Sequence, residues 1–297
     1  CGRSLLRKRE LKRMKAQLID GKRISAEIKA EAAEEAAALK AKGITPCLAV
    51  VLVGDDSASQ VYVNNKKKAC EAVGIRSVSH VLSGGTTEEA LLELIAKLNA
   101  DKDIHGILVQ MPVPKQIDER KVILAIDPKK DVDCFHPVNV GNLHTGGEGF
   151  LPCTPAGIIE LIKRSGHSIE GKQCVVIGRS NIVGKPVAML LMQENGTVTI
   201  CHSRTRNLAE ICRGADIIVS AVGKVNTVTA DMVKEGAILI DVGMNRNEAG
   251  KLCGDVDFDG VSQVCGAITP VPGGVGPMTI SMLLENTLAA AKLQNSL

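Results

Sequence analysis

Short apolar runs alternate with helix-forming segments along most of this chain, and this alternation constrains the fold more than any other feature. In the first half, apolar runs at 48–53, 77–82 and 104–111 are separated by helices expected at 57–73 and from Thr86 or Thr87 to about 99, and a further helix is expected at 24–42. Strands that are separated by helices predict a parallel sheet with helices on its faces.

The same alternation starts again in the second half. The expected order is a helix at 156–165, a strand at 174–178, a helix at 183–194, a strand at 197–201, a helix at 207–214, strands at 216–222 and 237–242, and a last helix from about 278 to 293. The segment at 127–155 is rich in Pro, Gly, Asn and His and is predicted to lack regular structure, which is typical of a functional loop or a domain junction. The second half is the better candidate for a Rossmann domain.

Charge and composition exclude several classes of protein. The chain has 36 Lys and Arg against 33 Asp and Glu, a net charge of +3, which gives no reason to expect nucleic acid or a membrane surface as a partner. No apolar run reaches the roughly 18 residues of a membrane-spanning helix. The ten cysteines include no Cys-x-x-Cys pair, so we expect free thiols in a reducing compartment and no metal site.

The first 13 residues are basic and lack the apolar core of a secretory signal. We interpret 1–13 as sequence upstream of a natural start at Met14, and we expect a cytoplasmic protein. A mitochondrial presequence is the alternative, and Glu10 and the lack of a serine-rich stretch argue against it.

A candidate dinucleotide site follows the strand expected at 174–178. The sequence there is GRSNIVGKP at 178–186, and a helix comes next. A strand, a glycine turn and a helix N-terminus are the context of a dinucleotide-binding site. The spacing departs from G-x-G-x-x-G because Ser180 takes the place of the second glycine, so an ordinary turn between strand and helix is the alternative.

The residues near this turn favour NADP over NAD. The strand expected at 197–201 is followed by His-Ser-Arg-Thr, with no acidic residue to bind a ribose 2′-hydroxyl. Arg179 and Arg204 are suited to a 2′-phosphate, because arginine makes forked, charge-assisted bonds to phosphate. A solvated surface charge is the alternative for Arg204.

The helix expected at 57–73 carries a candidate general base. At about 100° per residue, Tyr62, Lys66, Cys70 and Val73 fall on one stripe of its surface, so Lys66 is predicted to face inward beside the only tyrosine of the chain. A desolvated lysine can act as a general base. The alternative is a lysine whose amine reaches solvent along the stripe.

Two further residues are candidates for the same site. Gln110 lies at the end of the strand expected at 104–111, where parallel sheets bind ligands, and its amide is suited to orient Lys66 or to bind a substrate. Asp133 lies in the long loop, and its carboxylate is suited to bind the amino and ring N–H groups of a heterocycle. A carboxylate that is only solvated is the alternative.

Six separated motifs, in order, resemble the bifunctional methylenetetrahydrofolate dehydrogenase/methenyltetrahydrofolate cyclohydrolase family. They are the Y-x-x-x-K helix at 62–66, LVQMP at 108–112, KDVD at 130–133, PCTP at 152–155, GRSNIVGKP at 178–186 and ITPVPGGVGPMT at 268–279. The resemblance runs from about Leu18 to Leu293. One position departs from it: Cys134 stands where the family usually has glycine, and a positive φ there would strain a cysteine.

This resemblance implies two reactions at one site. 5,10-Methylenetetrahydrofolate gives a hydride to NADP⁺, and the 5,10-methenyl cation is hydrolysed to 10-formyltetrahydrofolate, as part of one-carbon metabolism. Lys66 then transfers protons in the hydrolysis and Gln110 holds its geometry. Tyr62 lines the pterin ring, and Asp133 anchors the amino edge of the pterin.

The resemblance also implies the binding residues and requires no metal. Folate is expected to contact Tyr62, Lys66, Val109, Gln110, Met111, Asp133, Pro272, Gly273, Gly274, Val275 and Gly276. NADP is expected to contact Gly178, Arg179, Ser180, Ser203, Arg204 and Met244.

The architecture that follows is α/β with two domains. We expect an N-terminal catalytic domain with a parallel sheet at 14–149, a Rossmann-type NADP-binding domain at 150–276, and a last helix at 277–297 that returns to the first domain. The active site is expected in the cleft between the domains, and a homodimer is expected from the family.

Three alternatives remain open. The first is a dehydrogenase that lacks cyclohydrolase activity or prefers NAD. The second is a two-domain dehydrogenase of amino or hydroxy acids, which would not explain the Y-x-x-x-K helix together with the PVPGGVGP loop. The third is a nucleotide-binding module without catalysis, which would gain little from an interior lysine.

Overall fold

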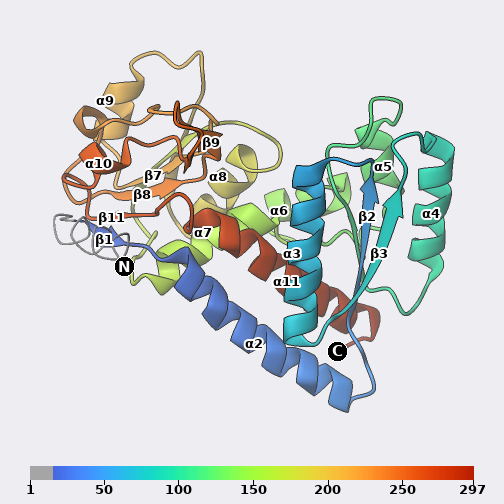
Figure 1. Cartoon of the computed structure of the whole chain (residues 1–297). Coiled ribbons are helices and arrows are strands. Elements are labelled where there is room, and N and C mark those ends of the chain that lie inside the picture. Colours follow the sequence, from blue (N-terminus) through green and yellow to red (C-terminus); the bar gives the residue numbers. More distant parts are fainter. Residues whose placement is uncertain (1–15) are drawn as a thin grey trace, which may run out of the picture. The chain divides into compact units, whose positions relative to one another are not determined.

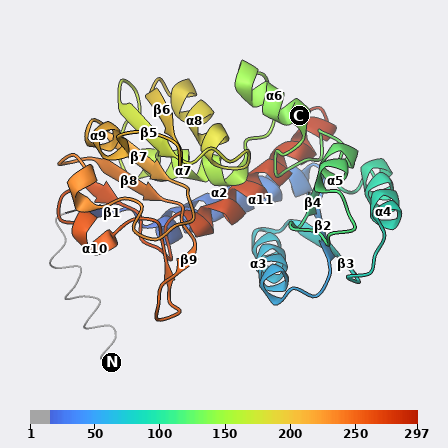
Figure 2. The same cartoon turned by 90° about the horizontal axis from the view of Figure 1, so that it is seen from above.

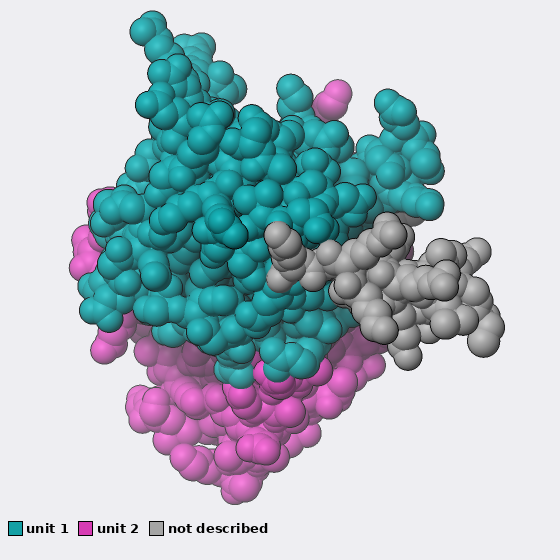
Figure 3. All heavy atoms as spheres, turned by 90° about the vertical axis from the view of Figure 1, so that its left-hand side faces the viewer, with its two compact units in different colours: residues 1–24, 154–278 teal, residues 25–153, 279–297 magenta. Residues whose placement is uncertain are grey.

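The computed structural model describes residues 16–297, so the segment predicted to lie upstream of the start, at 1–13, falls outside the described residues. The chain divides into two compact units, coloured separately in Figure 3. Unit 1 contains residues up to 24 and residues 154–278, and unit 2 contains residues 25–153 and 279–297. Both units contain a parallel sheet with helices, which confirms the predicted α/β class.

Unit 2 is built on a three-stranded parallel sheet in the order β3–β2–β4. The strands are β2 (Cys47–Val53), β3 (Arg76–Leu82) and β4 (Gly106–Val109), so the last is shorter than predicted. Every residue of β2 is buried, which explains its uninterrupted apolar sequence. Figures 1 and 2 show α3 (Ser57–Val73) and α4 (Glu88–Ala100) on opposite sides of this sheet.

Local capping sets the ends of these two helices. α3 has the predicted bounds, but its N-cap is Asp56, whose carboxylate accepts a hydrogen bond from Ser59 N at 2.7 Å. Gly74 ends α3 in the left-handed conformation, with φ of 83°. Thr87 rather than Thr86 caps α4, because its hydroxyl accepts from Ala90 N at 3.2 Å.

The prediction that 127–155 lacks regular structure is wrong. This segment contains α6 (Pro137–Thr145) and the start of α7 (Cys153–Arg164), and the short α5 (Glu119–Ala125) precedes it. His136 caps α6 by accepting from Val138 N at 3.2 Å, and Gly146 ends it. Pro137 contributed to the prediction of a loop. In the first turn of a helix, however, proline removes only an N–H that has no partner within the helix, so Pro137 favours the start of α6.

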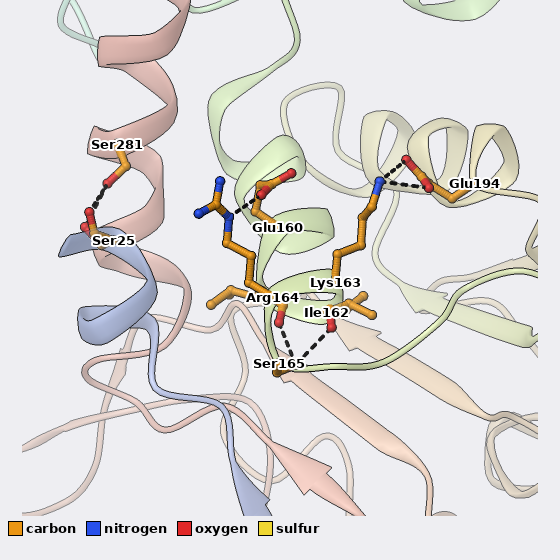
Figure 4. A network of polar contacts seen from close by, with 9 residues as sticks. Ser25, Glu160, Ile162, Lys163, Arg164, Ser165, Glu194 and Ser281 are labelled. Carbon is orange, nitrogen blue, oxygen red and sulfur yellow. Dashed lines mark hydrogen bonds and ion pairs between the residues drawn. The ribbon is translucent and has the colours of Figure 1, made fainter. Parts of the chain in front are cut away.

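Two long helices complete unit 2. They are α2 (Gly21–Ala41), which enters the unit at residue 25, and α11 (Val275–Gln294), which enters it at residue 279. The buried hydroxyls of Ser25 and Ser281 join them at 2.7 Å (Figure 4), and Lys292 forms an ion pair with Glu35. α11 begins three residues earlier than the predicted 278.

Unit 1 is built on a six-stranded parallel sheet in the order β1–β11–β8–β7–β5–β6. The strands are β1 (Gln17–Leu18), β5 (Gln173–Ile177), β6 (Thr197–Cys201), β7 (Ile217–Ser220), β8 (Ile238–Asp241) and β11 (Ala267–Ile268). The four neighbouring strands β8, β7, β5 and β6 were predicted, and Figure 2 shows them side by side. β1 corrects the expected domain boundary: the residues from 14 were assigned to the first domain, but this strand pairs with β11 of unit 1.

Helices and a hairpin surround this sheet. They are α8 (Gly184–Gln193), α9 (Leu208–Arg213), the 3-10 turn η1 (Ala230–Met232), α10 (Phe258–Val261), and an antiparallel hairpin of β9 (Asn245–Arg246) and β10 (Leu252–Cys253). Strand residues such as Val175 and Ile218 pack with Cys212 and Val261 in one core. On α7, Lys163 pairs with Glu194 at 3.1 Å and Arg164 with Glu160 at 2.7 Å (Figure 4).

Candidate active site

Gln110 lies at the point of the unit 2 sheet where parallel sheets usually bind ligands. β3 pairs with one side of β2, and β4 pairs with the other. The crevice outside the carboxyl ends of two strands at such a reversal is a common ligand site. Gln110 directly follows β4, and its backbone N–H donates to the Val51 carbonyl of β2 at 2.8 Å.

The structure brings Lys66 and Gln110 together. Lys66 Nζ donates to Gln110 Oε1 at 3.0 Å, and Gln110 Nε2 donates to the Met111 carbonyl at 2.9 Å. The second bond determines which end of the amide faces the lysine. A lysine ammonium has three hydrogens, so the contact with Gln110 uses one of them. Lys66 is partly buried.

The stripe of α3 that contains Lys66 is buried at one end and exposed at the other. Cys70 and Val73 are buried, whereas the Tyr62 side chain is 44 % exposed. The prediction that the whole stripe faces inward is therefore wrong for Tyr62. α3 follows the carboxyl end of β2, and its first turns lie near that edge of the sheet. Helical periodicity predicts which face of a helix is buried, but not how far along the helix the burial extends.

Val109 and Met111, which flank Gln110, lie differently. The Val109 side chain is 4 % exposed and belongs to the core that β2 and β4 form with α4. Met111 is partly buried and packs against the same core. Of the two, Met111 therefore has the more accessible side chain.

Asp133 is held by the residues that precede it. Val132 is fully buried and packs against β4, where a Cβ at Gly106 would lie 2.7 Å from Val132 Cγ1. The buried Asp131 carboxylate accepts from His136 N at 2.8 Å and from Asn139 Nδ2 at 2.9 Å. Hence the backbone on both sides of Asp131 is fixed.

The surroundings of Asp133 raise the pKa of its carboxyl group. Burial is the main cause of this rise, and the neighbouring charge of Lys66 offsets part of it. Cys153 Sγ lies 3.9 Å from Asp133 Oδ1 and 3.5 Å from the Val132 carbonyl. Burial and Asp133 raise the pKa of the Cys153 thiol well above its usual value, so this sulfur is a neutral donor. Cys153 lies in the PCTP motif, to which the sequence assigned no separate role.

Cys134 has the backbone conformation that its position in the resemblance suggested. Its φ is 59°, in the left-handed region that favours glycine. The side chain is 1 % exposed, and Sγ donates to the Phe150 carbonyl at 2.9 Å. Burial raises the pKa of this thiol to about 12, so it is protonated and able to donate.

The candidate dinucleotide site of unit 1 lies at a second reversal of strand order. β6 pairs with one side of β5 and β7 with the other, and Gly178 directly follows β5. Gly178 has φ of 130°, and a Cβ there would lie 2.4 Å from the Ala221 carbonyl oxygen, beyond the end of β7. A Cβ at Gly184, the first residue of α8, would lie 2.4 Å from the Gly178 carbonyl oxygen. Only glycines allow this close backbone approach.

The predicted NADP contacts are spread around this turn. Arg179, Ser180, Ser203, Arg204 and Met244 are all exposed. Ser180 Oγ also accepts from the Val183 and Gly184 N–H groups, both at 3.2 Å, and so caps the start of α8. Met244 follows β8, which also ends at the carboxyl edge of the sheet.

Two buried carboxylates that sequence analysis missed organise this edge. Asp255 is fully buried and accepts from the N–H groups of Val222, Gly223 and Lys224, which follow β7, at 2.7 to 3.2 Å. Asp241 accepts from Gly243 N and Asp255 N, both at 2.9 Å. Burial raises the pKa of Asp241 to about 6. In the sequence, a single acidic residue near the end of a strand looks the same whether its carboxylate is buried or solvated, so neither residue was a candidate.

The predicted folate loop at 272–276 belongs to unit 1. Gly274 packs against the start of α2, where a Cβ at Gly21 would lie 1.9 Å from the Gly274 carbonyl oxygen. Gly273 is buried, and Pro272 is exposed. Val275 and Gly276 form the first turn of α11 rather than a loop. The role of these five residues stays a prediction.

The part of the chain that the structure describes shows neither a clustered metal site nor a membrane-spanning helix. Among residues 16–297, no group of three or more His, Cys, Asp or Glu side chains is arranged to hold a metal ion. No helix in the same part of the chain combines the length and apolarity required to cross a membrane.

Comparisons with known proteins agree with the geometry. The model of the tetrahydrofolate dehydrogenase/cyclohydrolase catalytic domain matches residues 19–133, and that of the NAD(P)-binding domain of the same family matches residues 152–295. The bifunctional protein FolD of Acetivibrio thermocellus is 60 % identical over 281 residues, which cover 95 % of this chain and 99 % of that protein.

Solved structures agree as well. The bifunctional FolD methylenetetrahydrofolate dehydrogenase/cyclohydrolase from Campylobacter jejuni has a TM-score of 0.92 and 53 % identity, and the match covers 95 % of this chain and 100 % of that one. The Trypanosoma brucei FolD, in complex with NADP and an inhibitor, has a TM-score of 0.89 and 42 % identity, with 95 % and 99 % covered.

Proposed function

Because this chain belongs to the tetrahydrofolate dehydrogenase/cyclohydrolase family, we propose that it oxidises 5,10-methylenetetrahydrofolate with NADP⁺ and hydrolyses the 5,10-methenyl product to 10-formyltetrahydrofolate. The membership confirms the resemblance that the motifs indicated. The chain spans nearly the whole length of its bifunctional relatives, which supports both activities rather than one.

The contact between Lys66 and Gln110 supports the hydrolytic step most directly. In this proposal, the neutral Lys66 amine accepts a proton from the water that attacks the methenyl carbon. The resulting ammonium group then donates a proton to the ring nitrogen as its bond to that carbon breaks, and the hydroxyl proton of the intermediate passes to solvent water as the formyl group forms. The bond of 3.0 Å to Gln110 Oε1 fixes the direction of Nζ during both transfers.

The accessible side chains near Lys66 support binding of the pterin. The exposed face of Tyr62 lies one turn of α3 before Lys66 and offers an aromatic surface to a flat ring. Asp133 offers its carboxyl group to the amino and ring N–H groups of the pterin. Met111 and the residues at 272–276 complete the proposed folate contacts.

The turn after β5 supports NADP as the cofactor. Gly178 and Gly184 let the turn after β5 pack closely against Ala221 and against the start of α8, so the N–H groups at the N-terminus of α8 lie at this turn, and Arg179 and Arg204 are exposed. We assign the 2′-phosphate to Arg179, Ser203 and Arg204, the pyrophosphate to Gly178 and Ser180, and a further contact to Met244. When bound, NADP⁺ supplies the acceptor of the hydride, and these residues hold and orient it.

One absorbance assay tests the function. The protein is mixed with 5,10-methylenetetrahydrofolate and NADP⁺, and then with NAD⁺. Formation of NADPH followed by decay of the methenyl band is expected. A persistent methenyl band would indicate a dehydrogenase alone, and a preference for NAD⁺ would refute the cofactor assignment. Turnover only with amino or hydroxy acids would indicate the other class of two-domain dehydrogenase.

Oligomeric state and location belong to the same proposal. We propose a homodimer, as the family resemblance implies, and light scattering of the purified protein should give twice the mass of the 297-residue chain. We propose a cytoplasmic location because the nine cysteines within residues 16–297 are all free thiols, which suits a reducing compartment.

A further inference from the structure

The side chain of Asn286 joins two segments of unit 2 that are distant in sequence. Asn286 lies on α11, and its Nδ2 donates to the Val132 carbonyl and to the Leu151 carbonyl, both at 2.8 Å. An amide nitrogen has two hydrogens, so both are used in these bonds. The same nitrogen lies 3.7 Å from Cys153 Sγ. None of the six motifs contains Asn286.

Both bonds act on the immediate surroundings of Asp133. The Val132 carbonyl belongs to the peptide bond that leads into Asp133. The Leu151 carbonyl lies two residues before Cys153, whose sulfur contacts both Asp133 Oδ1 and the Val132 carbonyl. Asn286 therefore holds the peptide before Asp133 and, through the 151–153 segment, the thiol that faces the Asp133 carboxylate.

Asp133 lies beyond the last backbone pairing with the sheet, so side-chain contacts have to hold it in place. The bridge between Ile107 and Asp131 is the last backbone pairing of this segment with β4. Beyond it, the chain turns at Cys134, with φ of 59°, and is fixed by the Asp131 carboxylate and by the bond from Cys134 Sγ to Phe150. Asn286 supplies a direct contact from α11 to the peptide before Asp133. An error of about 1 Å in a group that binds substrate can cost on the order of a hundredfold in rate.

We propose that Asn286 is a positioning residue that sets the place of the Asp133 carboxylate against the folate substrate. This inference rests on the proposed function, because it gives Asp133 the role of binding the pterin. It extends that function to a residue of the returning helix that does not itself touch the reacting atoms.

The test compares three single variants of the 297-residue chain, and the double variant that combines two of them. Asn286→Ala removes both bonds. Gln294→Ala is the matched control, since Gln294 also lies on α11 and its Nε2 donates to two backbone carbonyls, those of His105 at 2.7 Å and Lys129 at 3.0 Å, neither of which adjoins Asp133. Asp133→Ala measures what the carboxylate itself contributes. Each variant is assayed for KM and kcat with 5,10-methylenetetrahydrofolate and with NADP⁺, and for thermal unfolding.

We expect Asn286→Ala to raise the KM for 5,10-methylenetetrahydrofolate about tenfold and to change the KM for NADP⁺ less than twofold, since only the folate anchor is displaced. In the Asp133→Ala background, the same substitution should have almost no further effect on the folate KM. Gln294→Ala should lower the melting temperature by a similar amount and leave both KM values unchanged.

Several results would overturn the proposal. They are an unchanged folate KM in Asn286→Ala, an equal effect from Gln294→Ala, or effects of Asn286→Ala and Asp133→Ala that multiply in the double variant. If Asn286→Ala does not fold, Asn286→Ser, which keeps a shorter donor, is judged by the same criteria. An unchanged folate KM in Asp133→Ala would instead refute the proposed role of Asp133 and, with it, the premise.

Discussion

Replacement of Gly178 by alanine should damage the fold and the cofactor site together. The residue has φ of 130°, a conformation that side chains other than glycine rarely adopt and that costs about 1–3 kcal/mol. The new methyl group would lie 2.4 Å from the Ala221 carbonyl oxygen, against an ordinary contact of about 3.4 Å. One of the two strand ends must therefore move by about 1 Å.

That movement has a defined consequence. The Ala221 N–H donates to the Ile177 carbonyl at 2.8 Å, and this bond closes the end of the pairing between β5 and β7. Its loss adds about 1 kcal/mol to the strain, so we expect the free energy of unfolding to fall by about 3 kcal/mol. This corresponds to a melting temperature lower by roughly 6 °C or more. Since the turn also approaches the start of α8, the affinity for NADP⁺ should fall at least about tenfold.

A second glycine separates the two causes. Gly166 has φ of 87°, and no atom lies within 4 Å of a Cβ placed there, so Gly166→Ala introduces backbone strain without a clash. It should cost about 1 kcal/mol and leave NADP⁺ binding unchanged. Both variants are compared by thermal unfolding and by titration of NADP⁺. If Gly178→Ala loses no more stability than Gly166→Ala, the argument from the close approach of the two strand ends is wrong.

Three other substitutions have effects that follow from the structure. Lys66→Met should slow decay of the methenyl band at least a hundredfold while NADP⁺ still binds, and unchanged hydrolysis would remove Lys66 from its role. Arg179→Ala should weaken NADP⁺ at least about tenfold and NAD⁺ less than about twofold, whereas equal losses would place the 2′-phosphate elsewhere. Burial raises the pKa of Asp241 from 3.8 to about 6, so the folded protein binds the extra proton, and its stability should fall by about 2 kcal/mol as pH rises from 4 to 7. Denaturant unfolding over this pH range should show that loss in the wild type relative to Asp241→Asn, and parallel curves would contradict it.

The sequence predicted those parts of the molecule whose signal is local. The buried runs of β2 and β5 and the helix at 57–73 have the periodicity or apolar length of their elements, and Gly74 marks the end of that helix. α6 was missed because its composition is that of a loop, and its stability comes from the His136 cap and from proline in its first turn. β1 has two residues, too few for any pattern, and is defined by its pairing with β11.

The site divides in the same way. Lys66, Gln110 and Asp133 were candidates because each has a chemical group at a recognisable place, on a helical stripe, at a strand end or in a motif. Nothing in the sequence singled out Asn286. It is one of several polar residues in α11, and the sequence of a helix does not show which distant group a polar side chain contacts. Its importance comes from two carbonyls more than 130 residues away in sequence, so only the folded chain shows it.

Cys134 shows how a departure from a family pattern can leave a site intact. A residue other than glycine at φ of 59° costs about 1–2 kcal/mol in backbone strain. Cysteine offsets part of that cost with the buried bond from Sγ to the Phe150 carbonyl at 2.9 Å, of about 1 kcal/mol, and with the burial of its side chain. Phe150 precedes the carbonyl that Asn286 holds, so the thiol joins the same two segments as the amide. The segment that carries Asp133 is thus fixed from both sides, by Asn286 before it and by Cys134 after it, without the glycine that the turn would otherwise favour.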